Sequence, residues 1–408
     1  MKVLMLAQTY APVVGGEERL VEDLSRELAA RGHEVVVATL RQPQAEPQAD
    51  QGGVRVRLLG SSVHSIPGLP THETTRYAAP LPDPRTTAEL RTVLREERPD
   101  VVHAHNWLVD SYLPLARRAR APLVLSLHDY GLLCPTKRLF LGGAVCSGPG
   151  AAKCLRHATE FYGTAKGALL AAGTPIADRW ARRRVDLFVS VSSAVAELCR
   201  VAGRPNHRVI PNFVRPLPPA PDPADPRLDF LPDGEFALYF GDVSEDKGAR
   251  VLLDAHARLG AGAPPLVMIG RRNVDGLDGA PGVIAPGPLP HALAIEAVRR
   301  SAFTVAPSLW AEPFGIVALE AAAAAKPLIA AASGGLRDVV LDGETGYLLP
   351  PGDSGALAAA IARLAADTEL RERMGAAALT RVGSVFSPEA VVPRFEQAYA
   401  DAIDAAAG

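Results

Sequence analysis

Residues 301–347 read S-A-F-T-V-A-P-S-L-W-A-E-P-F-G-I-V-A-L-E-A-A-A-A-A-K-P-L-I-A-A-A-S-G-G-L-R-D-V-V-L-D-G-E-T-G-Y, and this stretch decides the fold. The short apolar run Phe303 to Ala306 is typical of a buried strand, and the proline after it ends the strand. Gly315 to Ala325 has high helix propensity, and Pro327 stops the helix. Leu328 to Ala332 is predicted to be the next strand. The order strand, loop, helix, strand is typical of an α/β sheet with parallel strands.

The start of the predicted helix favours an anion. Its free N–H groups and the positive end of its dipole suit a phosphate, and Pro313 lies at or just before the first turn, where a missing N–H costs nothing. Glu320 follows about five residues later, roughly 7.5 Å along the axis, where it can accept hydrogen bonds from ribose hydroxyls. Glu312 in the loop can do the same for a sugar. This geometry predicts a nucleotide-diphosphate-sugar site; the alternative is a buried helix with two solvated glutamates.

Several spaced elements of this stretch resemble a known family. Glu312 and Glu320 form an E-x7-E pair, followed by K-P-L-I-A, a G-G turn and D-G-E-T-G-Y. The stretch resembles the donor site of the retaining glycosyltransferases of family 4, which have the GT-B fold. That resemblance implies two Rossmann-like α/β domains facing a cleft, with a C-terminal helix that crosses back to the first domain. It also implies front-face transfer with retention, in which the leaving phosphate helps to deprotonate the acceptor.

Length, composition and net charge narrow the class of protein. A chain of 408 residues exceeds the usual limit of about 250–300 for one core, so two domains are expected. Apolar residues make up 48% and charged residues 22%, and the net charge of −2 gives no reason to expect nucleic acid as a partner. The apolar run after Lys2 is too short for a signal peptide, and no apolar stretch reaches the length of a membrane helix. A cytoplasmic protein is therefore expected.

The N-terminal segment predicts a doubly wound unit. Val3 to Ala7 suits a buried strand, Glu17 to Arg31 an amphipathic helix, and Glu34 to Thr39 the second strand. Ligands of such units lie at the carboxyl ends of the strands, where Gly15 and Gly16 fall. A glycine pair alone usually makes a turn, but the segment P-x-V-G-G-E resembles the family's glycine loop between donor and acceptor.

Histidines end two further predicted strands, Asp100 to His105 and Leu123 to Leu127. A strand-end histidine is commonly a structural hydrogen-bonder, but two strands here deliver histidines to the same edge of the sheet. H-D-Y-G-L-L-C-P resembles a segment of some bacterial family members. The resemblance implies that His128 contacts the donor sugar and Asp129 the acceptor hydroxyl. It also makes acceptor-side candidates of His103, Asn106 and Trp107.

The state of the four cysteines stays open. Cys134, Cys146, Cys154 and His157 could form a Cys3His zinc site, although no C-x2-C knuckle is present. The cysteines could instead form a disulfide or stay as free thiols, and free thiols are favoured.

Thr159 to Ala172 is predicted to be a helix that ends at Gly173 and Pro175. Residues 177–184 then carry one tryptophan and four arginines. A basic helix with a tryptophan can lie on an anionic membrane surface, and a solvated charged face is the alternative. Peripheral contact with the cytoplasmic membrane face would suit a lipid-linked acceptor.

Residues 216–232 hold seven prolines and predict an extended linker. We therefore expect an acceptor-binding domain over residues 1–215, a nucleotide-sugar-binding domain over residues 216–386 that includes this linker, and the crossover helix over residues 387–408. In the second domain the family commonly has G-R followed by K-G, with the Arg and Lys on the diphosphate. Lys247 matches this pattern, but Asp242 replaces the arginine. Arg271 or Arg272 could supply the missing cation; a solvated turn is the alternative.

The segment Gly287 to Pro290 resembles the family's loop whose backbone holds the nucleobase, which implicates Leu289. Catalytic roles are assigned to His128, Glu312 and Lys247. The expected donor-binding residues share a place at strand ends or at the start of the helix in the opening stretch: Gly15, Gly16, Lys247, Arg271, Arg272, Leu289, Glu312, Pro313, Phe314, Gly315, Ile316, Val317 and Glu320.

The expected reaction moves a hexosyl unit from a nucleotide-diphosphate sugar, such as a UDP- or GDP-sugar, to a saccharide or lipid-linked acceptor in polysaccharide or glycoconjugate biosynthesis. No D-x-D pair occurs in the sequence, so we expect no metal and no cofactor. Two alternatives remain: a sugar-nucleotide epimerase or hydrolase, and a non-catalytic sugar-nucleotide-binding protein.

Overall fold

Continuous apolar runs in the N-terminal half pair into one eight-stranded sheet, in the order β10-β9-β6-β5-β1-β2-β4-β3. All neighbouring pairs are parallel except β3 and β4. The strands are β1 (Lys2–Ala7), β2 (Glu34–Leu40), β3 (Asp50–Gln51), β4 (Val54–Leu59), β5 (Val101–His105), β6 (Leu123–Leu127), β9 (Leu187–Ser190) and β10 (His207–Val209). Residues 3–7 are fully buried, as expected for a parallel sheet that helices cover on both faces.

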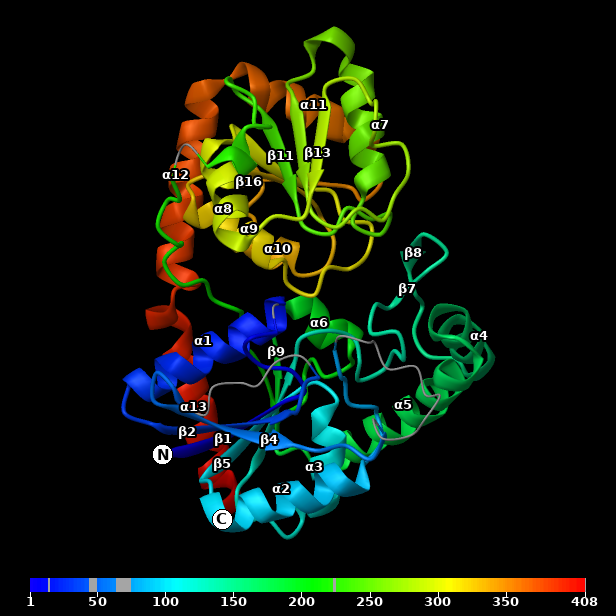
Figure 1. The fold of residues 1–408 in the computed structure, drawn as a ribbon, viewed down its shortest axis with the longest axis vertical. Helices are drawn as coiled ribbons and strands as arrows, with labels where there is room; N and C mark the ends of the chain where they lie inside the picture. Colours follow the sequence, from blue (N-terminus) through cyan, green and yellow to red (C-terminus); the bar gives the residue numbers. More distant parts are fainter. Residues whose placement is uncertain (14, 44–49, 64–74, 223–224, 408) are drawn as a thin grey trace. The chain divides into compact units, whose positions relative to one another are not determined.

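The structure is a computed structural model and describes residues 1–13, 15–43, 50–63, 75–222 and 225–407 (Figure 1). Residues 223 and 224 of the predicted linker thus lie outside the described residues. The chain divides into two compact units. The first comprises Met1–Leu139, Ser147–Pro211 and Val391–Gly408, and the second comprises Phe140–Cys146 and Asn212–Ala390.

Six helices follow the strands of the first unit: α1 (Gly16–Ala30), α2 (Pro84–Glu97), α3 (Leu108–Ala116), α4 (Ala151–Tyr162), α5 (Thr164–Arg184) and α6 (Ser193–Leu198). The Asp83 side chain caps α2 by accepting the N–H of Thr86 at 2.9 Å. The Ser192 hydroxyl caps α6 in the same way. The predicted helix 17–31 and the predicted strands 34–39 and 123–127 agree with the structure to within one residue.

The predicted helix at 159–172 is wrong in both of its boundaries. Gly163, at φ 83°, separates α4 from α5, and α5 continues through Gly173 and Pro175 to Arg184. Gly173 serves close packing instead of ending the helix, since a Cβ there would lie 3.1 Å from the Leu81 side chain. Tertiary packing has overridden local propensity. The basic segment 177–184 is therefore the last two turns of a 21-residue helix.

The C-terminal helix α13 (Pro388–Ala407) belongs to the first unit from Val391 onward. The Glu396 carboxylate lies 2.9 Å from His33 Nε2, and the Arg394 guanidinium donates to the Val209 carbonyl at 2.6 Å. Tyr399 is fully buried against the sheet. The red helix thus lies among the blue and cyan elements of the first unit in Figure 1.

A six-stranded parallel sheet forms the second unit, in the order β13-β12-β11-β14-β15-β16. Its strands are β11 (Ala237–Phe240), β12 (Leu266–Ile269), β13 (Val283–Gly287), β14 (Phe303–Ala306), β15 (Leu328–Ala331) and β16 (Gly346–Leu349). Its helices are α7 (Ala249–Leu259), α8 (His291–Arg300), α9 (Ile316–Ala323), α10 (Leu336–Val339), α11 (Ser354–Ala366) and α12 (Thr368–Val385). A short hairpin, β7 (Phe140–Leu141) with β8 (Ala144–Val145), and two 3-10 turns, Pro226–Leu228 and Gly260–Gly262, complete it.

Side chains alternate along β11 between two apolar cores. Ala237 and Tyr239 pack in the cluster that includes α7 and α11, whereas Leu238 packs in the cluster that includes α8. Figure 1 shows α7 and α11 on one side of this sheet and α8 on the other. In the part of the chain that the structure describes, no helix is long and apolar enough to cross a membrane.

Candidate functional site

The loop between β14 and α9, residues 307–315 (the Glu312 loop), is clamped by the glycines before α10. The N–H of Gly335 donates to the Glu312 carbonyl at 2.6 Å. A Cβ on Gly334 would lie 2.1 Å from the same carbonyl oxygen, and one on Gly335 would lie 2.5 Å from the Pro313 oxygen. Only glycine permits this approach of two backbones. The G-G turn therefore holds the loop in one place.

The Glu312 carboxylate has three donors. Its Oε2 lies 2.6 Å from Lys247 Nζ, 2.8 Å from Trp310 Nε1 and 3.4 Å from the Ser308 hydroxyl. The Lys247 ammonium also lies 4.7 Å from the centre of the Trp310 ring. The lysine side chain is 25% exposed and the glutamate 14%, so the pair faces solvent at the lysine. The two predicted catalytic residues of this unit are thus in direct contact.

Glu320 is buried on α9, with 7% of its surface exposed, and its Oε1 lies 2.6 Å from His291 Nε2. His291 is the first residue of α8 and directly follows the predicted nucleobase loop, in which Leu289 packs partly buried against the core. The sequence prediction missed His291. Its position after G-P-L-P was the only available signal, since the contact spans 29 residues.

Helix α9 begins at Ile316, one residue later than the predicted helix, and Gly315 is its N-cap at φ 91°. Pro313 therefore lies three residues before the helix, not in its first turn. The Phe314 side chain is buried against Phe386, so only its backbone can face a ligand. Ile316 and Val317 occupy the first turn, where N–H groups have no acceptor within the helix.

The Asp242 carboxylate, at the place of the missing arginine, is paired. Arg271 binds both of its oxygens, through Nε at 3.0 Å and Nη2 at 3.1 Å. The Arg272 guanidinium instead lies 2.6 Å from Asp278. Of the two candidates for a substitute cation, Arg271 is thus the one held beside Asp242.

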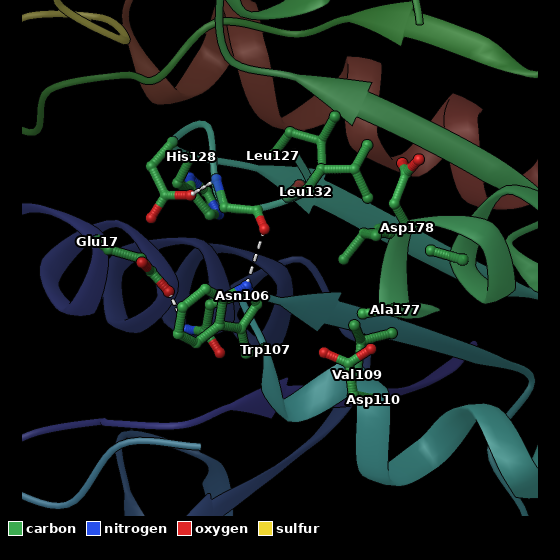
Figure 2. Close-up of a pocket in the computed structure, with 15 residues that line it drawn as sticks. Glu17, Asn106, Trp107, Val109, Asp110, Leu127, His128, Leu132, Ala177 and Asp178 are labelled. Atoms are coloured by element: carbon green, nitrogen blue, oxygen red, sulfur yellow. Dashed lines mark hydrogen bonds between the residues drawn. The ribbon is translucent and has the colours of Figure 1, made fainter. Parts of the chain in front are cut away.

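In the first unit a cavity opens at the carboxyl ends of β5 and β6. Register pairs His105 with Ser126, so the residues after both strands meet at one edge. The cavity has about 450 Å³ of empty space, a figure that includes space open to solvent, and it is bordered by α1, α3, α5 and the loop after β6 (Figure 2). We call it the carboxyl cavity; it is lined by Glu17, Asn106, Trp107, Val109, Asp110, Leu125, Ser126, Leu127, His128, Asp129, Gly131, Leu132, Ala177, Asp178 and Ala181. The predicted residues Asn106, His128 and Asp129 are therefore brought together.

Two carboxyl groups of the cavity titrate far above their usual range. Asp110 is 3% exposed, and burial raises its pKa from 3.8 to about 8. Burial likewise raises the pKa of Glu17 to about 8, although Lys137 and a hydrogen bond from Asn106 lower it. Both acids therefore hold their protons near neutral pH. The sequence prediction had assigned neither residue to the site.

The three histidines have different surroundings. His103 is fully buried, with Nδ1 2.7 Å from the Tyr399 hydroxyl and Nε2 2.7 Å from the Ser126 hydroxyl. Both of its nitrogens are engaged, so we leave it out of the proposed acceptor contacts. His105 Nδ1 lies 2.8 Å from His128 Nε2, and burial lowers the pKa of His128 to about 4. His128 is thus a neutral imidazole that one neighbour orients.

Asp129 and Trp107 form the rim beside His128. Asp129 Oδ1 accepts the N–H of Gly131 at 2.6 Å, and Oδ2 lies 3.7 Å from Lys137 Nζ. The same ammonium lies 4.2 Å from the centre of the Trp107 ring, whose Nε1 donates to the Gly131 carbonyl. The predicted glycines are also at a helix start: Gly15 is the N-cap of α1 and Gly16 its first residue.

The cysteines do not gather. Cys134, Cys146, Cys154 and Cys199 are free thiols, and Cys154 Sγ accepts the Gly150 N–H at 3.4 Å. Within residues 1–13, 15–43, 50–63, 75–222 and 225–407, no group of three or more His, Cys, Asp or Glu side chains could hold a metal ion. A Cys3His zinc site with His157 as its fourth ligand therefore has no support among these residues.

Family models match most of the chain. Residues 15–212 match the glycosyl transferase 4-like domain, and residues 224–381 match glycosyl transferases group 1. The chain is 28% identical to glycogen synthase of Mycobacterium tuberculosis, over 98% of this chain and 94% of that one. It is 31% identical to D-inositol 3-phosphate glycosyltransferase of Kineococcus radiotolerans, over 92% of this chain and 88% of that one.

Solved structures show the same fold. Sucrose-phosphate synthase from Thermosynechococcus elongatus has a TM-score of 0.74 at 22% identity, with 99% of each chain covered. Anabaena Alr3699/HepE in complex with UDP-glucose has a TM-score of 0.68 at 19% identity, covering 98% of this chain and 100% of that chain. The likeness, together with the two parallel sheets, confirms the predicted fold class of two Rossmann-like domains.

Proposed function

This chain belongs to the family 4-like glycosyltransferases of the GT-B fold, and we propose that it moves a hexosyl unit from a nucleotide-diphosphate sugar to a saccharide or lipid-linked acceptor with retention of configuration. The names of its relatives support this class of reaction: a glycogen synthase, a D-inositol 3-phosphate glycosyltransferase and a structure with bound UDP-glucose. Assembly of a polysaccharide or glycoconjugate is the corresponding role.

One observation carries the proposal, namely the network on the Glu312 loop. Lys247, Trp310 and Ser308 hold the Glu312 carboxylate, and His291 holds Glu320. The groups are fixed before any ligand arrives, because glycines 334 and 335 lock the loop. A preorganised network of charged and polar groups is what differential stabilisation of a transition state needs.

Negative charge builds on the diphosphate as the C1–O bond of the donor breaks. The Lys247 ammonium and the N–H groups of Ile316 and Val317 are the groups that we assign to this charge. Each such donor commonly contributes about 2.7–4 kcal/mol to lowering the barrier. Glu320 would accept from the ribose hydroxyls, and Glu312 from hydroxyls of the sugar. His291 would orient the Glu320 carboxylate.

On the acceptor side the assigned residues are His128, Asn106 and Asp129. Burial keeps His128 neutral down to a pH of about 4, so it contacts the transferred sugar as a hydrogen-bonding group and not as a cation. Asp129 is tied to the Gly131 N–H through one oxygen, and Lys137 is near the other. We assign Asp129 to the acceptor hydroxyl.

A direct test uses purified protein with a panel of UDP-, GDP- and ADP-sugars and saccharide acceptors. Release of the nucleotide diphosphate should require an acceptor, and the new glycosidic bond should keep the anomeric configuration of the donor by NMR. Activity should survive chelation by EDTA, since we propose a metal-independent reaction. Inversion of the anomeric centre would refute the retaining mechanism.

The same assay separates the rival functions. Conversion or hydrolysis of the donor without an acceptor would indicate an epimerase or hydrolase. Tight donor binding without any turnover would indicate a non-catalytic binding protein. Glu320→Gln should weaken donor affinity in a titration, and unchanged affinity would remove Glu320 from the site.

Peripheral membrane contact is proposed for the face of α5 that includes residues 177–184. Leu169, Ile176 and Trp180 are exposed at i, i+7 and i+11, which places them on one side of the helix. Arg179 and Arg183 lie exposed on the last turns of the same helix. Trp180→Ala should reduce co-sedimentation with anionic vesicles and leave the melting temperature unchanged. Equal sedimentation of both proteins would contradict the contact.

A further inference from the structure

The carboxyl cavity has an unusual charge balance. Among the described residues that line it, four carry carboxyl groups, and none is a lysine or an arginine. The four are Glu17, Asp110, Asp129 and Asp178. Figure 2 shows Glu17, Asp110 and Asp178 on three different sides of the pocket. A ligand in this cavity therefore meets oxygen acceptors and acids from several directions.

Three of the four carboxyl groups have partners in the protein. Glu17 accepts a hydrogen bond from the Asn106 amide, and Asp178 lies 2.7 Å from Arg182 Nε. Asp129 accepts the Gly131 N–H and has Lys137 near its second oxygen. These three residues are also only partly buried, so water and protein groups share in solvating their carboxyl groups.

Asp110 differs from them. It is 3% exposed, it lines the cavity, and no hydrogen-bond partner for its carboxyl occurs among the described residues. Only the more distant charge of Lys137 acts on it. A polar group that is buried beside a cavity and has no partner in the protein calls for a ligand.

The ligand that suits this group is a cation. A metal ion does not fit, because no three ligating side chains in the described part of the chain converge on one point. An ammonium does fit, since the protein already holds one at the cavity rim: Lys137 Nζ lies between the Trp107 ring at 4.2 Å and Asp129 at 3.7 Å. Burial favours the protonated, neutral form of Asp110. A bound ammonium would neutralise the carboxylate in place of that proton.

We propose that the carboxyl cavity receives an acceptor that carries a protonated amino group, such as an amino sugar or an aminocyclitol, with Asp110 as its counter-ion. This assignment rests on the proposed glycosyltransferase function and names its acceptor class. A phosphorylated acceptor is disfavoured, because Asp129 and Asp178 line the cavity and the ammonium at its rim, Lys137, already lies beside Asp129. The apolar lining from Val109, Leu125 and Ala181 suits the carbon faces of a small ring.

The test compares three acceptors of one size that differ in charge: glucosamine, glucose and glucose 6-phosphate. Binding is measured by calorimetry at a pH at which the amine is protonated, with the nucleotide diphosphate present. Glucosamine should bind about tenfold or more tightly than glucose, a modest gain because desolvation offsets much of a buried ion pair. Glucose 6-phosphate should bind least.

Asp110→Asn keeps the size of the side chain and should reduce glucosamine to the affinity of glucose. Glu160→Gln removes an equal charge from an exposed position on α4 and should change nothing. Thermal unfolding reports whether Asp110→Asn folds, and the three-acceptor comparison on the unmodified protein needs no variant. Equal affinities, a preference for the phosphate, or no millimolar binding of glucosamine would overturn the proposal.

A measurement of donor binding distinguishes a wrong acceptor class from a wrong proposed function. A nucleotide diphosphate should raise the melting temperature by mass action, independently of any acceptor. Donor binding without an amine preference would overturn only the acceptor class. Absence of donor binding would overturn the proposed function itself.

Discussion

Acidic side chains lie at two places: on the Glu312 loop and helix α9 in the second unit, and in the carboxyl cavity of the first unit. The two places differ in whether the protein supplies hydrogen-bond partners for these acids. In the second unit, the Glu312 carboxylate has three donors, and the Glu320 carboxylate on α9 is bound to His291. In the cavity, Asp110 lacks a hydrogen-bond partner among the described residues, and burial raises its pKa to about 8. An acid with fixed partners is preorganised for its task, and an acid without them is the place where the proposed ligand would complete the site.

Backbone packing produces this difference. At the loop, glycines let two backbone segments approach closely and hold the Glu312 carboxylate where Lys247, Trp310 and Ser308 meet it. At the cavity, α1, α3, α5 and the loop after β6 leave a space between them that is open to solvent. The four predictions that follow test the contrast, from the largest expected effect to the smallest.

Gly334→Ala should break the loop. The new Cβ would lie 2.1 Å from the Glu312 carbonyl at φ 59°, so we expect a loss of about 2–4 kcal/mol in stability and about a hundredfold in kcat/KM. Gly343→Ala is the matched control, since it has φ 75° and no atom within 4 Å. It should cost only about 1–2 kcal/mol and leave kcat/KM unchanged. Equal kinetics for the two variants would show that the clamp is not needed.

Lys247→Ala should sharpen the assignment of the cation. It removes the one ammonium that contacts Glu312, and we expect kcat/KM to fall about 100- to 1000-fold through loss of charge stabilisation on the diphosphate. Arg250→Ala removes an equal charge from an exposed position on α7 and should behave as the parent protein. A full rate in Lys247→Ala would move the diphosphate contact elsewhere.

Asp110→Asn should change how the free energy of unfolding depends on pH. The pKa of this acid is 3.8 in the unfolded chain and about 8 in the folded one, so the unfolded chain loses its proton first as pH rises. Its contribution to the free energy of unfolding is present below pH 4 and is lost as pH rises towards about 8. The variant should therefore match the parent near pH 4 and exceed it by at least about 1 kcal/mol near pH 8.

Parallel urea titrations of parent and variant across this range measure the difference. Glu17 titrates in the same direction in both proteins, so it cancels in the comparison. A variant that is less stable than the parent near pH 8 would show that Asp110 has a partner in the folded protein.

Arg271→Ala should have the smallest effect. The pair with Asp242 is exposed, so the free energy of unfolding should change by less than about 1 kcal/mol. The unmasked Asp242 charge should raise the donor KM about threefold to tenfold with little change in kcat, as expected for one exposed charge. Adding Asp242→Asn should restore the KM. If the double variant keeps the raised KM, Arg271 itself contacts the donor.

The prediction of the Glu312 loop rested on local sequence patterns. The strand over 303–306 and the positions of Glu312 and Glu320 follow from runs of apolar residues and from helix propensity, which neighbours in the chain decide. Lys247 was predicted because Lys247-Gly248 resembles the family's K-G pattern, and the structure brings it to Glu312. Asp242 could be recognised as a departure, but its pairing with Arg271 required the contact between the loops after β11 and β12.

The amino-acid sequence by itself thus determined the α/β class, the glycine positions and the acids of the E-x7-E pair, because propensity, periodicity and spacing act over a few residues. Only the tertiary structure decided that His291 meets Glu320, that α5 runs through Gly173 and Pro175, and that Asp110 is left without a hydrogen-bond partner among the described residues. These outcomes depend on burial and on contacts between distant segments, and a one-dimensional pattern carries no measure of either.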